Sequence, residues 1–508
     1  MDAPLGNVED AADAAVHGCD QSHRADRLLR EPQGPLMEVR HQTQHLVIGS
    51  GAGGAVTAAY LAEAGESVLI LEEGSAVRSG EVGQFSLEQM RRQYRKSGMT
   101  AMFGNYLVNY VEGCCLGGSS EINSGLYHLP DERLLGEWRD SHKVKDLSVT
   151  SIGHYARDIE ETLAIALTES GPTDGASLRL LEGAKRLRWQ CQEVPRWAHR
   201  DDDGHTIWHG MSSTFIPRAE KAGANLITDA RAERITIRNR RAAGVIAKGS
   251  DGVPFFISAE RVWVCCGSIG TASLLKRSGC SLRGGGLSAH PTVKATATFS
   301  ESLGPALDVP THQIKEFAPD ITIGGSSRTA SQIALAISED WPDGSGYLAE
   351  PDNVGIFYAA VRPKNQPGSV INLPGVSDPL PLLWVSKRDR MLLSSGLRRT
   401  CHLLLSAGAK EIRTGIPGLG PLRSAEDTAR LPRILPLSAN LMTVHTFSTV
   451  PMGEKADVCP ADSFGTLREV RGIQVNDASL IPSAPGINPQ GTVMALAARN
   501  VDHYLASR

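Results

Sequence analysis

A glycine-rich turn, set between a short buried strand and a helix, constrains the fold of this chain more than any other feature. The apolar run HLVIGS at residues 45–50 predicts a buried strand, and AVTAAYLAEA at 55–64 predicts a helix that ends at Gly65. The run SVLILEE at 67–73 predicts a second buried strand. A strand, a tight turn, a helix and a strand within about thirty residues form a βαβ unit.

The turn reads Gly49-Ser50-Gly51-Ala52-Gly53-Gly54 and fits the GxGxxG pattern of dinucleotide-binding sites. Gly49 permits the tight turn, Gly51 lets the backbone approach a pyrophosphate, and Gly54 lets the helix pack closely on the strand. The phosphate is expected at the helix N-terminus, where free N–H groups and the helix dipole favour anions.

The second strand of the unit ends at Glu72, which is expected to accept hydrogen bonds from a ribose 2′-hydroxyl. A carboxylate at this position repels a 2′-phosphate, so NADP is disfavoured. These residues alone leave FAD and NAD open as the ligand. The cofactor-binding residues predicted from this unit are Gly49, Gly51, Ala52, Gly53, Gly54 and Glu72.

The charge balance excludes several other classes of function. Lys and Arg number 52 and Asp and Glu number 56, a net charge of −4. This balance argues against a basic nucleic-acid groove and against a patch for anionic membranes. Aromatic residues make up 5% of the chain, too few for a base-stacking platform. At roughly 150 residues per domain, the 508 residues predict about two to four domains.

Cysteine usage and the N-terminus indicate a soluble, cytoplasmic protein. The nine cysteines include two adjacent pairs and no CxxC motif, so a disulfide framework is not expected. The acidic N-terminus lacks the features of a signal peptide. The uncharged stretch 46–62 is glycine-rich and shorter than a membrane span, so we expect no membrane partner. Residues 1–40 are interpreted as a flexible polar tail.

Two polar segments contain candidate metal ligands but match no compact metal-binding pattern. In the N-terminal segment these are His17, Cys19 and His23. In segment 198–210 they are His199, Asp201, Asp203, His205 and His209. We interpret the second segment as a solvated loop and predict no metal site.

The remainder of the chain predicts further helices and a second sheet. Segments 151–195 and 213–224 predict helices, and 261–275 again predicts a strand that enters a glycine turn and a helix. Residues 291–385 alternate apolar and polar side chains in several short runs broken by Pro and Gly, which is typical of an antiparallel sheet. The run 389–409 predicts an amphipathic helix.

Four further stretches accompany the first glycine turn. They are GGSSEINSG (117–125), GSIGTASLLKRSG (267–279), HTFSTVPMG (445–453) and DASLIPSAPGINPQGTVMALAARN (477–500). Together with VIGSGAGGAVTAAYLAEAGESVLILEEG, they resemble the signatures of the glucose–methanol–choline (GMC) oxidoreductase family. The matches follow the family's order between residues 45 and 500, and several ordered motifs are far more specific than one GxGxxG.

The resemblance implies an FAD-dependent enzyme that oxidises an alcohol to a carbonyl compound, with O₂ or another electron acceptor. In the family, a histidine at the position of His445 takes the hydroxyl proton, a residue at Asn488 hydrogen-bonds the same oxygen, and hydride passes to flavin N5. A histidine pKa near 6.5 suits a base at neutral pH. By its apolar surroundings alone, His445 could be a core histidine; the downstream Met452-Gly453 and Asn-Pro blocks favour the catalytic role. His290 is interpreted as structural.

The resemblance also implies the contacts of the cofactor. It places Asn123 near the flavin ring, Asp477 and Ala478 near the ribityl and pyrophosphate groups, and the backbone of Ala232 at the adenine. A helix capped by Asn488, with Pro489 at its first position, would direct its partial positive charge at the flavin C2=O. The residues implied in this way are Gly117, Gly118, Ser119, Asn123, Ala232, Asp477, Ala478, Asn488, Pro489 and Gln490. Ile122 stands where some members tether FAD to a histidine, so we expect non-covalent FAD.

The predicted fold class is α/β, with an FAD-binding doubly wound (Rossmann-like) domain and a second α+β substrate domain built on an antiparallel sheet. The FAD-binding domain is expected to comprise segments 41–150, 211–290 and 436–508. The substrate domain is expected to comprise segments 151–210 and 291–435. The chain is short for the family, so reduced lid and substrate insertions are expected.

Two departures from the family signatures affect the expected function. Ser448-Thr449 replaces the usual Gly-Thr and Val450-Pro451 replaces a Cys-Arg or similar pair, which reshapes the loop beside the base. A non-redox lyase or isomerase on the same flavin scaffold is therefore the alternative function. The presence of His445 and Asn488 disfavours a flavin-binding protein that has lost catalysis. The aliphatic character of residues 354–405 favours a fairly apolar or bulky alcohol over a small sugar.

Overall fold

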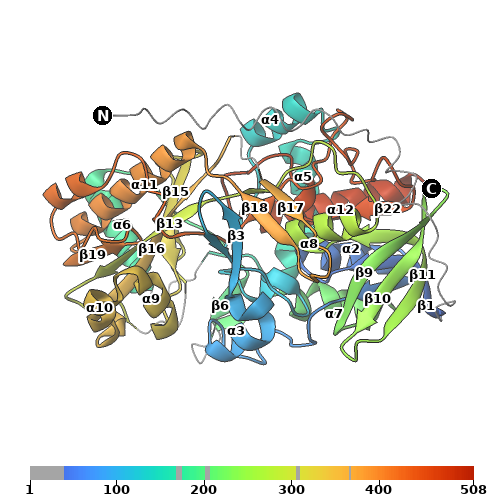
Figure 1. The fold of residues 1–508 in the computed structure, drawn as a ribbon, viewed down its shortest axis with the longest axis horizontal. Helices are drawn as coiled ribbons and strands as arrows, with labels where there is room; N and C mark the ends of the chain where they lie inside the picture. The colour runs from blue at the N-terminus through green and yellow to red at the C-terminus, as the bar shows by residue number, and fades with distance from the viewer. Residues whose placement is uncertain (1–38, 168–173, 201–205, 305–308, 365–367) are drawn as a thin grey trace, which may run out of the picture. The chain divides into compact units, whose positions relative to one another are not determined.

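Two large β-sheets form the framework of the protein (Figure 1). The computed structural model describes residues 39–508 except 168–173, 201–205, 305–308 and 365–367. The predicted tail therefore lies outside the described residues apart from its last two positions, and so do its candidate ligands His17, Cys19 and His23.

The first sheet has the strand order β8-β2-β1-β11-β10-β9, and β22 also pairs with β11. Strands β8, β2, β1, β11 and β22 run parallel to one another, whereas β10 pairs antiparallel with both β11 and β9. The first half of β11 pairs with β10 and its last three residues pair with β22. The strands are β1 (Val39–Ile48), β2 (Val68–Leu71), β8 (Asn225–Ile227), β9 (Ala230–Arg238), β10 (Arg241–Gly249), β11 (Pro254–Val264) and β22 (Ile473–Val475).

Helices from distant parts of the chain cover this sheet. Helix α2 (Ala52–Glu63) follows β1 and packs against α7 (Phe215–Lys221) and α12 (Gln490–Ala506), and α12 in turn packs against α5 (Val149–Thr162). Nine of the twelve residues of α2 are buried, as expected for a helix enclosed on most sides. Helix α8 (Gly267–Arg277) follows β11 and contacts β9. The strand–turn–helix unit is thereby held in one apolar core with the C-terminal helix.

The second sheet has the order β17-β18-β3-β4-β20-β13-β16-β15-β14-β5, and β19 also pairs with β13. Its central pairs are antiparallel. Its strands are β3 (Thr100–Gly104), β4 (Val108–Tyr110), β5 (Cys191–Glu193), β13 (Thr292–Thr298), β14 (His312–Ile314), β15 (Ile321–Ser326), β16 (Val354–Val361), β17 (Gly368–Ile371), β18 (Leu380–Leu383), β19 (Glu411–Thr414) and β20 (Leu441–Thr443).

One face of the second sheet is covered by α11 (Lys387–Ser406), with α6 (Gly175–Leu187) beside it. A Cβ on Gly396 of α11 would lie 2.9 Å from the Cβ of Ala359, so this helix packs very closely on β16. Because successive strand residues point to opposite faces, Tyr358 and its register neighbours face away from α11. That second face carries polar side chains that reach the active site described below.

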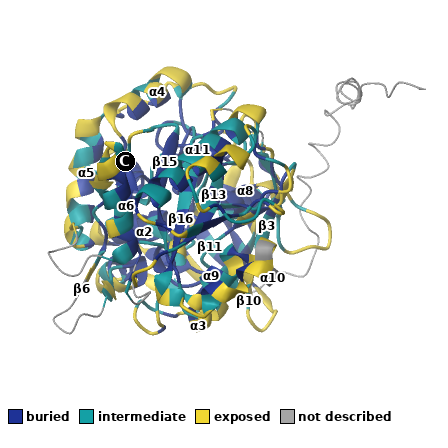
Figure 2. Ribbon diagram, turned by 90° about the vertical axis from the view of Figure 1, so that its left-hand side faces the viewer, coloured by how far each residue is buried: buried dark blue, intermediate teal, exposed yellow. Residues whose placement is uncertain are grey.

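Shorter elements complete the described part of the chain. The helices are α3 (Leu87–Gln93), α4 (Glu132–His142), α9 (Ala330–Ala336) and α10 (Trp341–Gly344), and the strands form the pairs β6 (Ala198–Arg200) with β7 (Thr206–Trp208) and β12 (Ser288–Ala289) with β21 (Thr446–Phe447). The 3₁₀ turns are η2 (Arg95–Gly98), η3 (Gly118–Glu121), η4 (Met211–Ser213), η5 (Ser338–Asp340), η6 (Ser345–Leu348), η7 (Pro351–Asn353), η8 (Glu426–Arg430) and η9 (Ala478–Leu480). Figure 2 shows the central strands buried and the outer surfaces of α3, α4 and α10 exposed.

The predicted fold class is confirmed, since a largely parallel sheet carries the glycine turn and a mainly antiparallel sheet forms the second part. The predicted helix at 389–409 corresponds to α11. The expectation of a solvated loop at 198–210 is wrong in part, because β6 and β7 pair as a hairpin. The two strands are joined by hydrogen bonds between backbone groups, which the polar composition of the segment does not predict. Asp201, Asp203 and His205 lie outside the described residues.

The segment 151–210 was expected to belong to the substrate domain, and its elements are shared between the two sheets. Helix α5 packs against α12 of the first sheet, whereas α6 packs against α11 of the second. We therefore propose to assign α5 to the FAD-binding part. None of the helices in the described ranges is both long and apolar enough to span a membrane.

Candidate active site

Close packing around the first glycine turn explains three of its glycines. Gly49 has a left-handed φ of +95°, and a Cβ there would lie 2.3 Å from the carbonyl oxygen of Cys265. A Cβ on Gly53 would lie 2.0 Å from the carbonyl oxygen of Asn476. A Cβ on Gly54 would lie 1.9 Å from the carbonyl oxygen of Gly49. These glycines let α2 and the turn approach the ends of β11 and β22, where no side chain fits.

Gly51 differs, because no protein atom competes for the space beside it. A Cβ at Gly51 would find its nearest neighbours, the Gly117 carbonyl oxygen and the Gly118 Cα, at 4.0 Å. The first and second glycine turns therefore face each other across a strip of bare backbone. Ala52 begins α2, so this strip lies at the N-terminus of a buried helix. The arrangement suits a pyrophosphate, which such helix ends attract.

Glu72 joins three turns of the site through its two carboxylate oxygens. Oε2 accepts hydrogen bonds from the Ser50 N–H at 2.9 Å and the Ser50 hydroxyl at 2.6 Å, and Oε1 accepts from the Gly74 N–H at 2.8 Å. The Gly117 N–H donates to the Ser50 hydroxyl at 3.0 Å. Burial raises the pKa of Glu72, and these hydrogen bonds oppose that rise. A carboxylate has about four acceptor positions, so one stays available to a ribose hydroxyl.

The second glycine turn is held by Glu121, which is buried and accepts hydrogen bonds from Ser79, Ser120 and Ser212. Gly117 and Gly118 line the strip opposite Gly51. Ser119 is exposed instead, and its hydroxyl accepts from the Gly113 N–H at 2.9 Å. The structure therefore brings the two glycines, but not the Ser119 hydroxyl, to the first turn.

The C-terminal motif reaches the same region from another direction. Asp477 is buried, and its carboxylate accepts from the Thr271 hydroxyl at 2.5 Å and the Ser479 N–H at 2.8 Å. Ala478 begins η9, directly after Asp477. The Asn123 side chain donates to Gln490 Oε1 at 2.6 Å, which joins the second glycine turn to the start of α12.

The expectation that Asn488 caps α12 is wrong. The helix begins at Gln490, its cap position is Pro489, and no side chain caps it. The Asn488 side chain points to the second sheet instead, where its Oδ1 accepts from Gln313 Nε2 at 3.2 Å. Asn488 therefore links the segment before α12 to β14 of the second sheet.

Several polar atoms near the start of α12 are buried without a hydrogen-bond partner among the described residues. They are His128 Nδ1, Gln490 Nε2 and the Thr492 hydroxyl. A Cβ on Gly491 would lie 2.5 Å from the His128 carbonyl oxygen, so these groups lie close together. Unpaired buried donors are costly unless a ligand satisfies them. Carbonyl oxygens and ring nitrogens of a flavin supply the acceptors that these groups lack, so the residues present fit FAD.

His445 lies beside His290 because β12 and β21 pair. The two rings stand nearly perpendicular, at 84°, with their Nδ1 atoms 3.1 Å apart. His290 Nε2 accepts from the Gly486 N–H at 3.0 Å, two residues before Asn488. Burial lowers the pKa of His445 to about 4. A neutral, partly buried imidazole therefore lies next to the segment that leads into α12.

The second sheet contributes polar side chains that sequence reasoning missed. Gln313 Nε2 donates to Asn488 and, at 3.0 Å, to the Tyr358 hydroxyl. Lys315 Nζ donates to Gln313 Oε1 at 2.6 Å and to His128 Nε2 at 3.1 Å. Burial lowers the pKa of Lys315 to about 8. Burial also lowers the pKa of His128, and the charges of Lys315 and His445 add to this effect. Gln313 lies in β14 and Lys315 directly follows it, and no local sequence pattern marks these two residues as part of a site.

The loop that departs from the family signature is fixed by its own contacts. Ser448 adopts a left-handed φ of +69°, and its hydroxyl donates to the Ile481 carbonyl oxygen at 2.8 Å. The Thr449 hydroxyl donates to the Ser268 carbonyl oxygen at 2.8 Å. Val450 is fully buried. These residues attach the loop to η9 and α8, so their hydroxyls serve packing.

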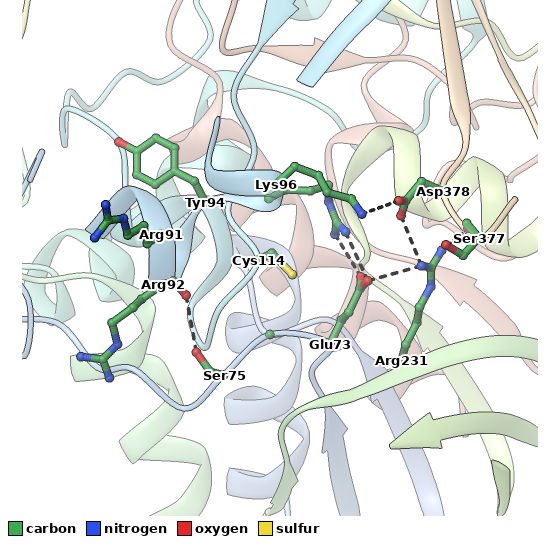
Figure 3. A pocket seen from close by; sticks show the side chains of 12 residues that line it. Glu73, Ser75, Arg91, Arg92, Tyr94, Lys96, Cys114, Arg231, Ser377 and Asp378 are labelled. Carbon is green, nitrogen blue, oxygen red and sulfur yellow. Dashed lines mark hydrogen bonds and ion pairs between the residues drawn. The ribbon is translucent and has the colours of Figure 1, made fainter. Parts of the chain in front are cut away.

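A cavity of about 380 Å³ is lined by residues that follow directly after β2. Figure 3 shows the side chains that line it. Its wall includes Glu73, Lys96, Arg231 and Asp378, which form ion pairs: Arg231 with Glu73 at 3.6 Å and with Asp378 at 3.3 Å, and Lys96 with Asp378 at 2.9 Å. Arg231 directly precedes Ala232, the predicted adenine contact. Ala232 is buried in the β9–β10 ladder. The cavity therefore lies beside the residue that the sequence predicts to contact the adenine.

No group of three or more His, Cys, Asp or Glu side chains is placed to hold a metal ion within the described ranges. His199 and His209 contact each other, with ring nitrogens 2.7 Å apart, at the foot of the β6–β7 hairpin.

Comparisons with known proteins agree with this geometry. The N-terminal family model of GMC oxidoreductase matches residues 43–292, and the C-terminal family model matches residues 377–497. An uncharacterised GMC-type oxidoreductase of Sinorhizobium fredii is 35% identical over 487 residues, which cover 92% of this chain and 96% of that protein. A long-chain-alcohol oxidase of Arabidopsis thaliana is 26% identical and is matched over 89% of this chain and 66% of its own length.

Among solved structures, pyridoxine 4-oxidase from Mesorbium loti has the same fold, with a TM-score of 0.70 at 16% identity over 91% of this chain and 99% of that one. The family models cover most of the two sheets and all of the glycine turns described above. The chain therefore belongs to the GMC oxidoreductase family, and FAD is its cofactor.

Proposed function

We propose that this protein oxidises an alcohol to a carbonyl compound, with His445 as the base. The observation that carries the proposal is the environment of His445. Its pKa is lowered to about 4, and its Nε2 forms no hydrogen bond with another described residue. A neutral imidazole with a ring nitrogen left over can meet a substrate hydroxyl. A relative of this chain is named a long-chain-alcohol oxidase, which supports an alcohol as the substrate class.

The residues around His445 supply the other polar contacts of the reaction. Because Gln313 occupies the Oδ1 of Asn488, the Asn488 amide keeps its two N–H groups for a substrate oxygen. Loss of the hydroxyl proton to His445 leaves negative charge on that oxygen, which an N–H donor stabilises. The bound FAD supplies the hydride acceptor. The side chains of His445 and Asn488 therefore hold and activate the alcohol oxygen.

Three groups of residues are proposed to hold FAD without a covalent bond. Gly51 and the N-terminus of α2 face the pyrophosphate, and Glu72 offers its remaining acceptor position to the ribose. Gln490 Nε2, the Thr492 hydroxyl and the first N–H groups of α12 donate to the flavin, and the helix dipole favours its anionic reduced form. Ile122 is buried and offers no nucleophile for a tether.

The decisive experiment is anaerobic mixing of the yellow holoenzyme with primary alcohols, secondary alcohols, sterols and sugars. Bleaching of the flavin absorbance by one class supports alcohol oxidation, and admission of air then shows whether O₂ is the acceptor. Product formation without bleaching would support the alternative of a lyase or isomerase. A flavin that stays oxidised with every alcohol would contradict the proposal.

The lowered pKa of His445 predicts an unusual pH dependence. A base must be neutral to accept a proton, so a pKa of about 4 keeps His445 active throughout the neutral range. We expect the rate constant of flavin reduction to stay constant between about pH 7 and pH 5 and to fall only below that range. An ordinary histidine would lose activity near pH 6.5. Anaerobic stopped-flow measurements over this pH range distinguish the two cases, and the visible absorbance shows whether FAD stays bound. A fall in the rate constant of flavin reduction near pH 6.5 would contradict the assignment.

Removal of Arg231 is expected to weaken FAD binding. Arg231→Ala removes the ion pairs to Glu73 and Asp378 in the wall of the cavity beside Ala232. Partly exposed ion pairs contribute about 0.2–1 kcal/mol each. Loss of these two pairs is therefore expected to raise the dissociation constant of FAD by about two- to thirtyfold, measured by titrating the apoprotein. Arg238→Ala, on the exposed end of the same strand, is the matched control. Equal affinities of the two variants would contradict a role for this cavity.

A further inference from the structure

The hydrogen bonds around His290 determine which of its ring nitrogens carries the proton. The Gly486 N–H points at His290 Nε2 from 3.0 Å, and a backbone N–H can only donate. His290 Nε2 is therefore an acceptor. Burial lowers the pKa of His290 well below its usual value, and the charges of His445 and Arg362 add to this effect. A neutral imidazole that accepts at Nε2 carries its proton on Nδ1.

The tautomer of His290 in turn determines that of His445. The Nδ1–H of His290 faces Nδ1 of His445 at 3.1 Å, so His445 accepts at Nδ1. Since His445 is also neutral, its own proton lies on Nε2. The opposite arrangement would place the Nε2–H of His290 against the Gly486 N–H, where two donors would face each other.

Rigid surroundings keep the two rings in this arrangement. The His290 side chain is 4% exposed, and its ring packs against Phe447 with centroids 4.9 Å apart. Its backbone N–H donates to the His445 carbonyl oxygen at 3.3 Å, next to the β12–β21 pair. The His290 ring therefore cannot turn without breaking the contacts of both neighbouring segments.

We propose that His290 is a positioning residue, which holds His445 in the tautomer with the proton on Nε2. The inference rests on the proposed function and deepens it. In this tautomer His445 meets the alcohol oxygen as a hydrogen-bond donor. To act as the base, His445 must first carry its proton on Nδ1 and free Nε2. The hydroxyl O–H bond then breaks, a bond to Nε2 forms, and the electron pair stays on oxygen. The tautomer of His445 that can act as a base is thus the minor form, because the hydrogen bond from the Gly486 N–H to His290 favours the other tautomer.

The direct test is nitrogen NMR of the holoenzyme labelled with ¹⁵N-histidine. His445→Gln identifies the signals of His445 by their loss. We expect a pyridine-type Nδ1 and an Nε2 with a bonded proton in the native protein at neutral pH. A proton on Nδ1 instead would overturn the inference. Because this readout does not depend on turnover, it stands even if no alcohol reduces the flavin, an outcome that would contradict only the proposed function.

Two variants of nearly equal size separate tautomer control from simple packing. His290→Gln keeps an acceptor for Gly486 and a donor for His445, so the native tautomer is expected. His290→Glu offers only acceptors, so the proton of His445 should move to Nδ1. On the pH-independent plateau we expect flavin reduction in His290→Glu to exceed that in His290→Gln about tenfold, the equivalent of one hydrogen bond released. Identical His445 spectra in the two variants would overturn the inference.

Discussion

Replacing His445 with glutamine is expected to slow reduction of the bound flavin by about 10²–10⁴-fold, while FAD stays bound. The physical reason is that the hydroxyl proton then has no acceptor beside Asn488, and an alcohol transfers hydride poorly while it keeps its proton. His445 is not among the residues assigned to the pyrophosphate or the ribose, so the affinity for FAD should not change. Anaerobic stopped-flow absorbance with an alcohol that bleaches the native flavin measures the effect.

A histidine far from the site supplies the control for this variant. His154 is exposed on α5, so His154→Gln should reduce its flavin at the native rate. The visible spectrum of each variant shows whether the flavin environment is intact. A His445→Gln protein that reduces its flavin at the native rate would remove His445 from the mechanism.

Substitution of single glycines in the first turn is expected to separate cofactor binding from folding. Gly51→Ala places a methyl group whose nearest protein atoms lie 4.0 Å away, at ordinary van der Waals contact, so the apoprotein should keep its stability. The same methyl group would occupy the space through which the pyrophosphate approaches the backbone. We therefore expect a loss of about 100-fold or more in FAD affinity, which corresponds to about 3 kcal/mol. Titration of the apoprotein with FAD, followed by fluorescence, measures this change.

Gly54→Ala is the matched variant for a structural effect. Its Cβ would lie 1.9 Å from the Gly49 carbonyl oxygen, so the backbone must move before FAD is present. Overpacking of this kind costs about 1–3 kcal/mol, and we expect a lowered midpoint in chemical denaturation of the apoprotein. If Gly51→Ala bound FAD normally, or destabilised the apoprotein as much as Gly54→Ala, the assignment of the strip to the pyrophosphate would be wrong.

The two large sheets differ in how much of them could be predicted. The strand–turn–helix of β1 and α2 follows from residues that are neighbours in sequence, and so does α11. The order of the strands does not, because β11 pairs with β1 and with β22, and each of these strands lies more than 200 residues away from β11 in the chain. The β6–β7 hairpin was missed for a related reason, since its stability comes from backbone pairing between polar residues.

The candidate site shows the same division. Asn123 and Gln490 were both predicted near the flavin, and the structure joins them by a hydrogen bond at 2.6 Å, although 367 positions separate them. Gln313 and Lys315 were missed, because nothing local distinguishes a polar residue that faces a site from one that faces water. The exposed position of Ser119 could not be predicted either, since it depends on the turn that Glu121 holds in place.

By itself, the sequence determined that a glycine turn opens a buried helix after a strand, and that its ordered motifs belong to one oxidoreductase family. Those are properties of short segments, in which the backbone conformation follows from the residue types present. Only the tertiary structure decided how His445 is protonated. That state depends on the backbone N–H of Gly486, which donates to His290 and thereby determines which nitrogen of His290 faces His445 as a donor. The two histidines are 155 positions apart in the sequence, and only the fold brings them into contact. Burial and hydrogen-bond direction arise only when distant segments meet, and they determine what an imidazole can do.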